Sequence, residues 1–221
     1  VGAESTRPGA TEISQELEWE RLSKVLKNII KVSGEYNIPV SVDTRNIETA
    51  LKSADLGVNW INDVSGLRDK YMYKILQKFK NLKIVVNHSL SLPENRDIKV
   101  ASNINIVEFI KNWALEKIEE LDSYGIGCER IIIDPGIGFG KTNIHNFELI
   151  KSAREIKTLP VKILYGHSRK SFMQIFTNYP PEARDIETYA VSQYLAMSSI
   201  DYIRVHDVIG NRRILNFVNS I

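Results

Sequence analysis

The sequence predicts an α/β fold in which helices cover a parallel β-sheet. Short β-rich runs recur at residues 40–42, 60–61, 84–86, 131–133, 163–165 and 202–205. Longer stretches with helical periodicity lie between them, as expected when each strand is followed by a helix that crosses back over the sheet. No linker rich in proline, glycine or serine interrupts this alternation, so we expect residues 1–221 to form a single domain.

The helical patterns can be followed from the N-terminus. Before the first β-rich run, one apolar stripe at helical spacing consists of Leu22, Val25, Leu26, Ile29 and Ile30. A helix is expected at 46–56, after that run. An apolar stripe from Ile104 to Leu121 predicts another helix. Helical periodicity also marks the segments 144–156 and 186–197.

Polar side chains follow almost every predicted strand. They are Asp43, Asn62 with Asp63, His88, Asp134, the run 168–170, and Arg204 with His206. An open doubly wound sheet gathers its functional groups at one switch point, whereas a barrel gathers them from many strand ends around one mouth. The spread of polar residues over all the strands therefore favours a barrel.

The number of strands falls short of a complete barrel. Six runs and a strand stub beginning at Val1 make seven, whereas a typical barrel has eight strands in about 250 residues. We therefore expect a barrel that is cut at its N-terminus.

The composition excludes several classes of function. A net charge of +2 is too small to predict binding to nucleic acid or to an anionic membrane. No apolar run reaches the length of a membrane span. The single cysteine, Cys128, rules out an internal disulfide and is typical of a reducing compartment, so we expect a cytoplasmic protein.

The run from Asp134 to Thr142, DPGIGFGKT, is the most distinctive part of the sequence. It follows three isoleucines, so an acid is expected at the exit of a buried strand, ahead of glycines that let a ligand approach the backbone closely. A phosphate-binding loop needs four residues between its first glycine and Gly-Lys-Thr, but Gly136 and Gly140 enclose only three. The run instead predicts a carboxylate that accepts hydrogen bonds from a flat heterocycle with adjacent N–H donors.

Six segments, in order along the chain, resemble the dihydropteroate synthase family. They are Glu4–Gly9, Ser41–Thr44, Ile61–Gly66, Asp134–Lys141, Gly166–Ser171 and Arg204–Asp207. The resemblance implies a (β/α)8 TIM barrel that lacks its first strand and helix and most of its second strand. It also implies a transferase of folate biosynthesis, which joins p-aminobenzoate to 6-hydroxymethyl-7,8-dihydropterin pyrophosphate and releases pyrophosphate.

The resemblance assigns a role to each polar strand end. The residues expected to bind the pterin are Asp43, Asn62, Asp134 and Lys170. Those expected to bind pyrophosphate and p-aminobenzoate are Thr6, Arg7, Pro8, Phe139, Ser168, Arg204 and His206. Catalytic roles are expected for Asp43, Lys170, Arg204 and His206. Taken one by one, these side chains could instead cap strands or helices or form structural ion pairs, because fold alone does not assign function.

Two of these residues have a spacing that fits their expected role. Arg204 and His206 alternate across Val205, so both face the same side of a strand. Arginine binds phosphate through two parallel hydrogen bonds, and histidine adds another donor, so the pair suits a pyrophosphate leaving group. We expect Mg2+ to arrive with the pyrophosphate and no metal ligand in this chain. The asparagine with which the family positions that ion lies outside the chain.

The chain departs from the family beside His88. The flanking residues are Asn87 and Ser89, where the family usually has methionines that pack on the pterin. The apolar floor of the pterin pocket is therefore expected to differ.

Two other interpretations remain open at this point. A pterin-binding methyltransferase domain would share the barrel and the acidic contacts, but it has no need of the 168–170 run or of Arg204 and His206. A non-catalytic fragment of the synthase would keep the fold without its activity. The resemblance also leaves open a homodimer and a place within a longer folate-pathway fusion.

Overall fold

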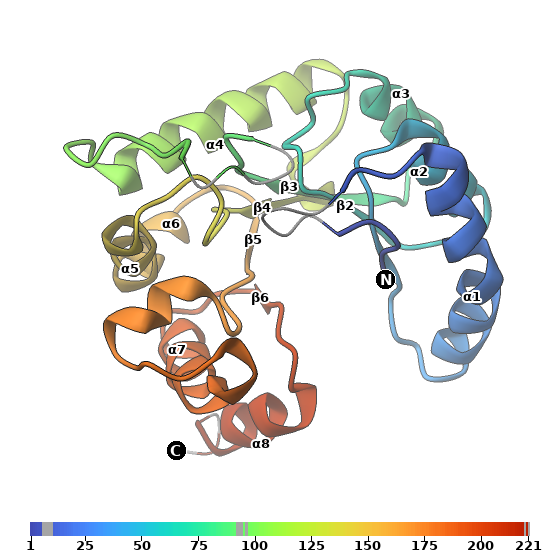
Figure 1. Ribbon diagram of the computed structural model, residues 1–221. Helices are drawn as coiled ribbons and strands as arrows, with labels where there is room; N and C mark the ends of the chain where they lie inside the picture. Colours follow the sequence, from blue (N-terminus) through green and yellow to red (C-terminus); the bar gives the residue numbers. More distant parts are fainter. Residues whose placement is uncertain (6–10, 92–94, 96, 219, 221) are drawn as a thin grey trace.

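Six parallel strands form one curled sheet in the computed structural model, which describes residues 1–5, 11–91, 95, 97–218 and 220 (Figure 1). The strands of these residues are β1 (Ser41–Asp43), β2 (Trp60–Asp63), β3 (Lys83–Asn87), β4 (Ile131–Asp134), β5 (Lys162–Tyr165) and β6 (Tyr202–Ile203). Each strand pairs in parallel with the next one along the chain. Strand order in a doubly wound sheet reverses at a switch point, so this consecutive order is the winding of a barrel, as predicted.

Helices connect the strands. The described α-helices are α1 (Gln15–Glu35), α2 (Ile47–Asp55), α3 (Tyr71–Lys78), α4 (Ile106–Ser123), α5 (Asn143–Lys151), α6 (Ala153–Ile156), α7 (Asp185–Met197) and α8 (Val208–Val218). Short 3-10 helices lie at Cys128–Arg130, Ser171–Ile175 and Pro181–Ala183.

The helices differ from the sequence prediction in four places. The predicted helix at 144–156 is two helices, because Ser152 ends α5 and begins α6. Serine competes for backbone hydrogen bonds and favours helix ends over helix interiors. The helices α3 and α8 were not predicted. The run 168–170 also predicts a following helix whose first N–H groups, with Ser168, would receive a carboxylate, but the segment after Lys170 is only a five-residue 3-10 helix.

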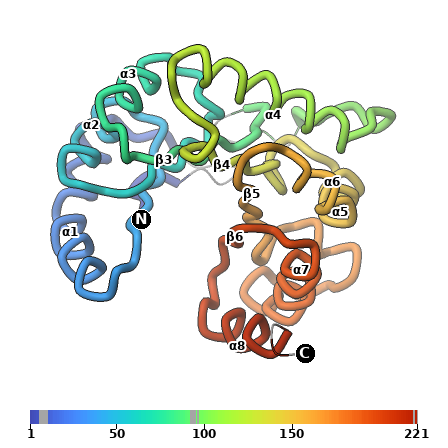
Figure 2. The backbone as a smooth tube through the Cα atoms, turned by 180° about the vertical axis from the view of Figure 1, so that it is seen from behind, coloured from blue at the N-terminus to red at the C-terminus, as the bar shows by residue number. Residues whose placement is uncertain are grey.

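The helices form an arc along the convex side of the sheet (Figures 1 and 2). Two contacts across the concave side show the curl. The ring of Trp60 in β2 packs edge-on against Tyr202 of β6, with centroids 4.9 Å apart. Arg204, just after β6, forms an ion pair with Asp43 at the end of β1. Strands far apart in the sheet therefore face each other across its interior.

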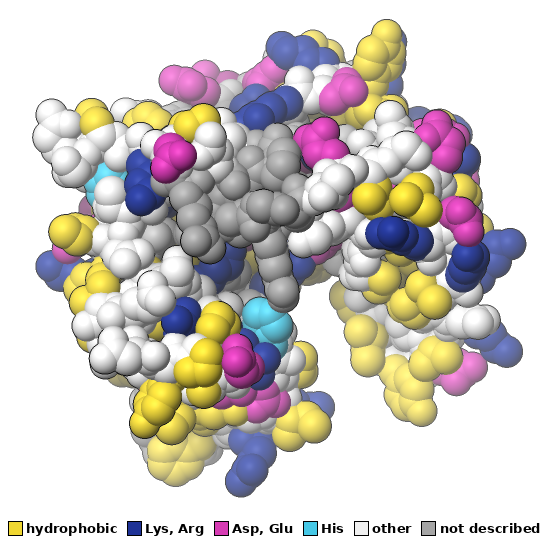
Figure 3. All heavy atoms as spheres, in the orientation of Figure 1, with side chains coloured by type: hydrophobic (Ala, Val, Ile, Leu, Met, Phe, Trp, Pro, Cys, Tyr) yellow, Lys and Arg dark blue, Asp and Glu magenta, His cyan; other side chains and the backbone are white. Residues whose placement is uncertain are grey.

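The sheet is open between its first and last strands. In the described part of the chain, β1 and β6 do not pair with each other, and Gly2 forms a parallel bridge to Asp43 on the other edge of β1. An open gap separates the lobe of α7 and α8 from the lobe of α1 (Figure 3). The expectation that the chain lacks the first strand and helix of an eight-stranded barrel, and most of its second strand, stays a prediction.

The two faces of the sheet bury different side chains. Toward the helices, a large apolar core includes Val42, Ile61, Ile84, Val86, Ile131, Ile133, Ile163 and Tyr165. Toward the interior, a small cluster consists of Val85, Ile132 and Leu164, with Trp60 and Tyr202 packed against it. Each fully buried aliphatic side chain contributes roughly 1.5–3 kcal/mol, so the helix-side core supplies most of the stability. The inner face can therefore carry polar groups at its open end.

Candidate active site

Four polar side chains line the inner face of the sheet at the C-terminal ends of its strands. These residues, called the floor below, are Asp43, Asn62, Asn87 and Asp134. The register pairs Asp43 with Asn62, and Asn87 with Asp134. Asn62 pairs with Val85, which lies two residues before Asn87 on the same face. Because neighbours in register point the same way, all four side chains face the interior.

The floor is buried and partly bonded within itself. Asn62, Asn87 and Asp134 are 3–5% exposed. The side-chain amide of Asn62 donates to Asp43 Oδ1 over 2.8 Å. The carboxylate of Asp134 accepts from the Gly136 amide over 2.8 Å. Burial raises the pKa of Asp134 above its usual range, and the Gly136 bond and nearby cations act in the opposite direction.

Two floor oxygens are buried without a hydrogen-bond partner in the described part of the chain. They are Asn62 Oδ1 and Asn87 Oδ1. Buried acceptors are almost always bonded in native proteins, so each such exception calls for an explanation. Together with the Asp134 carboxylate, they make a set of acceptors that suits a ligand rich in N–H donors.

The glycine loop after β4 is held in place by its own lysine. Lys141 is only 5% exposed, and its ammonium donates to the carbonyls of Gly136 and Phe139 over 2.9 and 3.1 Å. The backbone φ of Gly136 is +72°, and a Cβ there would overlap the His88 carbonyl, so only glycine fits. Lys141 is thus an anchor of the loop, a role that the sequence alone did not reveal. Its position supports the interpretation that this run is not a phosphate loop.

His88 lies outside the site, on the helix side of the sheet. Its ring packs edge-on against Phe109 and Trp113 of α4, with centroids 5.6 and 4.9 Å away. Burial, and secondly the charge of Lys141, lower the pKa of His88 to about 3. The imidazole is therefore neutral at physiological pH. It supports the glycine loop from the helix side of the sheet, because its Nδ1 lies 2.9 Å from the Lys141 ammonium.

A second group of side chains, called the rim below, follows β5 and β6. The rim consists of Ser168, Lys170, Arg204 and His206. Ser168 Oγ lies 2.9 Å from His206 Nδ1 and accepts from the His206 amide over 3.2 Å. The Lys170 ammonium lies 4.3 Å from the ring centroid of Phe139 in the glycine loop. Arg204 forms the ion pair with Asp43, which joins the rim to the floor.

Arg169 and Asp207, which flank rim residues in sequence, serve the structure. Arg169 has a φ of +58° and binds Asp185 through two bonds of 2.7 Å. Asp207 accepts hydrogen bonds from Tyr189 and from the Gly210 amide in α8. Asp207 could also have paired with Arg204, its neighbour in sequence, but Arg204 pairs with Asp43. Sequence reasoning also missed Arg184, which is buried and donates to the Arg169 and Lys170 carbonyls over 3.4 and 3.3 Å.

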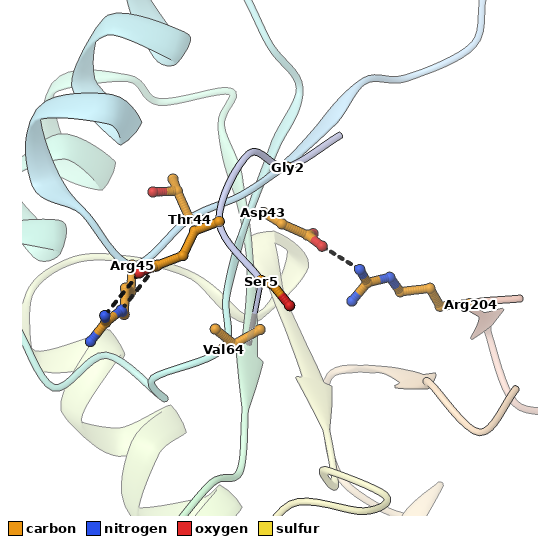
Figure 4. Close-up of a pocket in the computed structure, with 8 residues that line it drawn as sticks. Gly2, Ser5, Asp43, Thr44, Arg45, Val64 and Arg204 are labelled. Atoms are coloured by element: carbon orange, nitrogen blue, oxygen red, sulfur yellow. Dashed lines mark hydrogen bonds and ion pairs between the residues drawn. The ribbon is translucent and has the colours of Figure 1, made fainter. Parts of the chain in front are cut away.

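A pocket of about 310 Å³ opens where floor and rim meet (Figure 4). Its lining is Gly2, Glu4, Ser5, Asp43, Thr44, Arg45, Val64 and Arg204. Arg45 binds Glu4 and Glu12 over 3.1 and 3.0 Å, which ties both acids to the loop after β1. The predicted site residues Thr6, Arg7 and Pro8 lie outside the described residues.

Among the described residues, no group of three or more His, Cys, Asp or Glu side chains could hold a metal ion. No helix in the same residues is long and apolar enough to cross a membrane.

Comparison with known proteins identifies relatives along almost the whole chain. The model of the family described as pterin binding enzyme matches residues 1–206. A dihydropteroate synthase of Clostridium beijerinckii is 38% identical over 223 residues, which cover 100% of this chain and 78% of that protein. A folate synthesis bifunctional protein of Chlamydia caviae is 36% identical over 219 residues, which cover 97% of this chain and 48% of that protein. The chain therefore spans about half the length of this bifunctional relative.

The fold is matched equally well. A crystal structure of dihydropteroate synthase from Anaplasma phagocytophilum with bound 6-hydroxymethylpterin-monophosphate has a TM-score of 0.94 to this chain. The two are 37% identical, and the match covers 99% of this chain and 86% of that one.

Proposed function

This chain belongs to the pterin-binding enzyme family, and from that premise we propose that it catalyses the dihydropteroate synthase reaction. In that reaction p-aminobenzoate is joined to 6-hydroxymethyl-7,8-dihydropterin pyrophosphate, and pyrophosphate is released. The observation that carries the proposal is the meeting of a buried floor of acceptors with a rim that holds Lys170 and Arg204. A substrate with a donor-rich ring at one end and an anion at the other fits such a mouth.

The floor is the proposed pterin site. Asp134 accepts hydrogen bonds from a ring N–H and the amino group, each charge-assisted bond contributing about 1.5–3 kcal/mol. Asn62 offers a donor and an acceptor to the heterocycle edge. Asp43 binds deeper ring nitrogens, and the Lys170 ammonium donates to the pterin carbonyl.

The rim is the proposed site for pyrophosphate and p-aminobenzoate. Arg204 and His206 receive the pyrophosphate, and Ser168 receives the benzoate carboxylate. Phe139 lies against the benzoate ring, and the segment with Thr6, Arg7 and Pro8 completes this subsite. Arg204 pairs with Asp43 in the structure. Pyrophosphate therefore competes with a floor carboxylate for the same guanidinium, and binding redistributes that pair.

The proposed chemistry is a substitution at the methylene carbon of the pterin. The bond between this carbon and the pyrophosphate oxygen breaks, and its electron pair leaves with the pyrophosphate. Lys170, Arg204 and His206 stabilise the developing negative charge because they are positioned before the reaction begins. The amine of p-aminobenzoate forms the new carbon–nitrogen bond and then loses one proton to solvent or to the released pyrophosphate. Mg2+ enters this scheme bound to the pyrophosphate of the substrate.

The rim also favours the synthase over a pterin-dependent methyltransferase. Both would use the floor, but only the synthase has an anionic leaving group and a benzoate to hold. The link between Ser168 and His206, and the position of Lys170 beside Phe139, favour the synthase.

The proposal is tested by incubating the chain with both substrates and Mg2+ and measuring pyrophosphate and dihydropteroate. We expect both products in equal amounts, and neither when p-aminobenzoate is left out. Pterin binding without either product would support a non-catalytic pterin-binding module instead. A chain carrying both Asp134→Ala and Arg204→Ala, purified in the same way, is the matched control for contaminating activity.

We also propose the compartment in which the chain acts and the proteins with which it is associated. Residues 1–221 act as one pterin-binding domain in the cytoplasm, where a lone thiol such as Cys128 stays reduced. The bifunctional relative makes fusion to another folate-pathway enzyme a natural context. A homodimer is the further partner to test, by measuring molar mass in solution.

A further inference from the structure

Asn87 is a floor residue to which the proposed function assigns no contact of its own. It ends β3, is 3% exposed, and presents a side-chain oxygen that has no hydrogen-bond partner among the described residues. An unpaired buried acceptor destabilises the ligand-free chain, because the oxygen has lost water and gained no donor. A ligand that donates a hydrogen bond to this oxygen would remove that cost.

The register places Asn87 between two proposed pterin contacts. It is the direct partner of Asp134 on the next strand, and neighbouring residues in register lie about 5 Å apart. On the other side, Asn62 pairs with Val85, two residues before Asn87 on the same face. The Asn87 amide therefore lies within the ring of floor side chains and cannot belong to the helix-side core.

The loop after β3 does not depend on the Asn87 side chain. The His88 amide donates to the Asp134 carbonyl over 3.0 Å. The Ser89 hydroxyl donates to the Val64 carbonyl over 2.9 Å, and the Arg68 guanidinium donates to the Ser89 carbonyl over 3.0 Å. These bonds hold the loop, so the amide is available to a ligand.

We propose that Asn87 is a further pterin-contacting residue, whose Oδ1 accepts a hydrogen bond from an N–H group of the bound ring. This inference rests on the proposed function. A 2-amino-4-oxo heterocycle carries a ring N–H and an amino group with two more hydrogens, and one carboxylate in a planar pairing binds only two of these donors. The one amino hydrogen that remains needs an acceptor, and the floor supplies it from the unpaired oxygens of Asn62 and Asn87. The floor of this protein thus selects for the donors of the ring in addition to its shape.

The test replaces Asn87 with leucine, which has a similar size and no polar atoms. We expect the affinity for 6-hydroxymethylpterin, measured by calorimetric titration, to fall about tenfold. The thermal midpoint of the ligand-free chain should stay the same or rise, because an unpaired buried polar group has been removed. Asn103→Leu, the same change at an exposed turn before α4, should alter neither quantity.

The other outcomes separate the Asn87 contact from the proposed function. If the parent chain binds the pterin and Asn87→Leu binds it equally well, the Asn87 contact is wrong and the proposed function stands. If the variant loses both thermal midpoint and affinity, Asn87 is a structural residue and the proposal fails. A parent chain that does not bind 6-hydroxymethylpterin would overturn the proposed function and the Asn87 contact together.

Discussion

The floor and the rim of the mouth differ in the properties that govern binding. Asn62, Asn87 and Asp134 in the floor are 3–5% exposed and offer mainly acceptors. Arg204 and His206 in the rim are exposed, and the Arg204 side chain is 56% accessible. Hydrogen bonds in the floor form without competition from water, whereas exposed charges are screened by solvent and salt. The floor is therefore suited to chemical discrimination, and the rim to attracting and releasing a charged group.

The two regions also differ in how the fold supports them. The floor ends rigid strands, and its loop is fixed by the buried ammonium of Lys141 and the neutral ring of His88. The rim lies on loops that are held from outside by ion pairs such as Arg169 with Asp185. Changes in the floor should therefore alter affinity strongly, and changes in the rim should alter it in proportion to the ligand's charge.

The largest effect is expected from Asp134→Ala. The loss of two acceptors facing buried donors should weaken binding of 6-hydroxymethylpterin by about 2–4 kcal/mol, measured by calorimetric titration. Asp55→Ala, which removes a surface carboxylate at the end of α2, is the control and should change nothing. An unchanged affinity in Asp134→Ala would mean that this acid is a structural cap and that the floor is not the pterin site.

The support beneath the floor should make the chain sensitive to acid. The unfolded chain protonates His88 near pH 6.5, but the folded chain keeps it neutral down to about pH 3. Its contribution to stability is therefore fully present above pH 6.5 and is lost at up to about 1.4 kcal/mol per pH unit below it. We expect His88→Gln to flatten the dependence of unfolding free energy on pH between 6.5 and 5, a difference of roughly 2 kcal/mol.

A second buried histidine limits how far the slope can flatten. Some slope will persist in His88→Gln, because burial also lowers the pKa of His167, to about 4. Identical slopes in the parent chain and His88→Gln would contradict the buried, neutral state of this ring.

Arg204→Ala and His206→Ala should separate the rim from the floor. Each should weaken binding of a pterin pyrophosphate ester by about 1–2 kcal/mol at low salt, and less at high salt, while sparing the bare pterin. Titrations with both ligands at two ionic strengths measure the difference. Equal losses for the two ligands would mean that these side chains contact the ring, and the division into floor and rim would be wrong.

The smallest effects are expected at the p-aminobenzoate end of the rim. Lys170→Ala and Ser168→Ala should raise the p-aminobenzoate concentration needed for half-maximal turnover by about threefold to tenfold, equivalent to about 1 kcal/mol. A sulfonamide, as a mimic of p-aminobenzoate, should compete with it in steady-state kinetics of the parent chain. Competition with the pterin ester instead would place the benzoate elsewhere.

Much of the fold could be predicted from local patterns. The apolar runs marked all six strands, and α4 and α7 matched their predicted segments closely because their periodic faces are long. α3 was missed although Met72, Ile75 and Leu76 have helical spacing, because eight residues make a weak pattern. The split at Ser152 and the 3-10 helix after Lys170 depend on local backbone choices that periodicity does not encode.

The sequence by itself determined which chemical groups stand at the strand ends, because an apolar run followed by a polar residue marks the point where a buried strand meets solvent. It thereby indicated Asp134, Asn62 and Arg204 as candidates. Only the tertiary structure decided which groups face inward, because that depends on register and curl. It turned His88 toward α4, Lys141 into the glycine loop and Arg169 toward Asp185. It also brought Asp43 and Arg204, at opposite ends of the sheet, into one ion pair, and it left Asn87 facing the mouth with an acceptor unpaired.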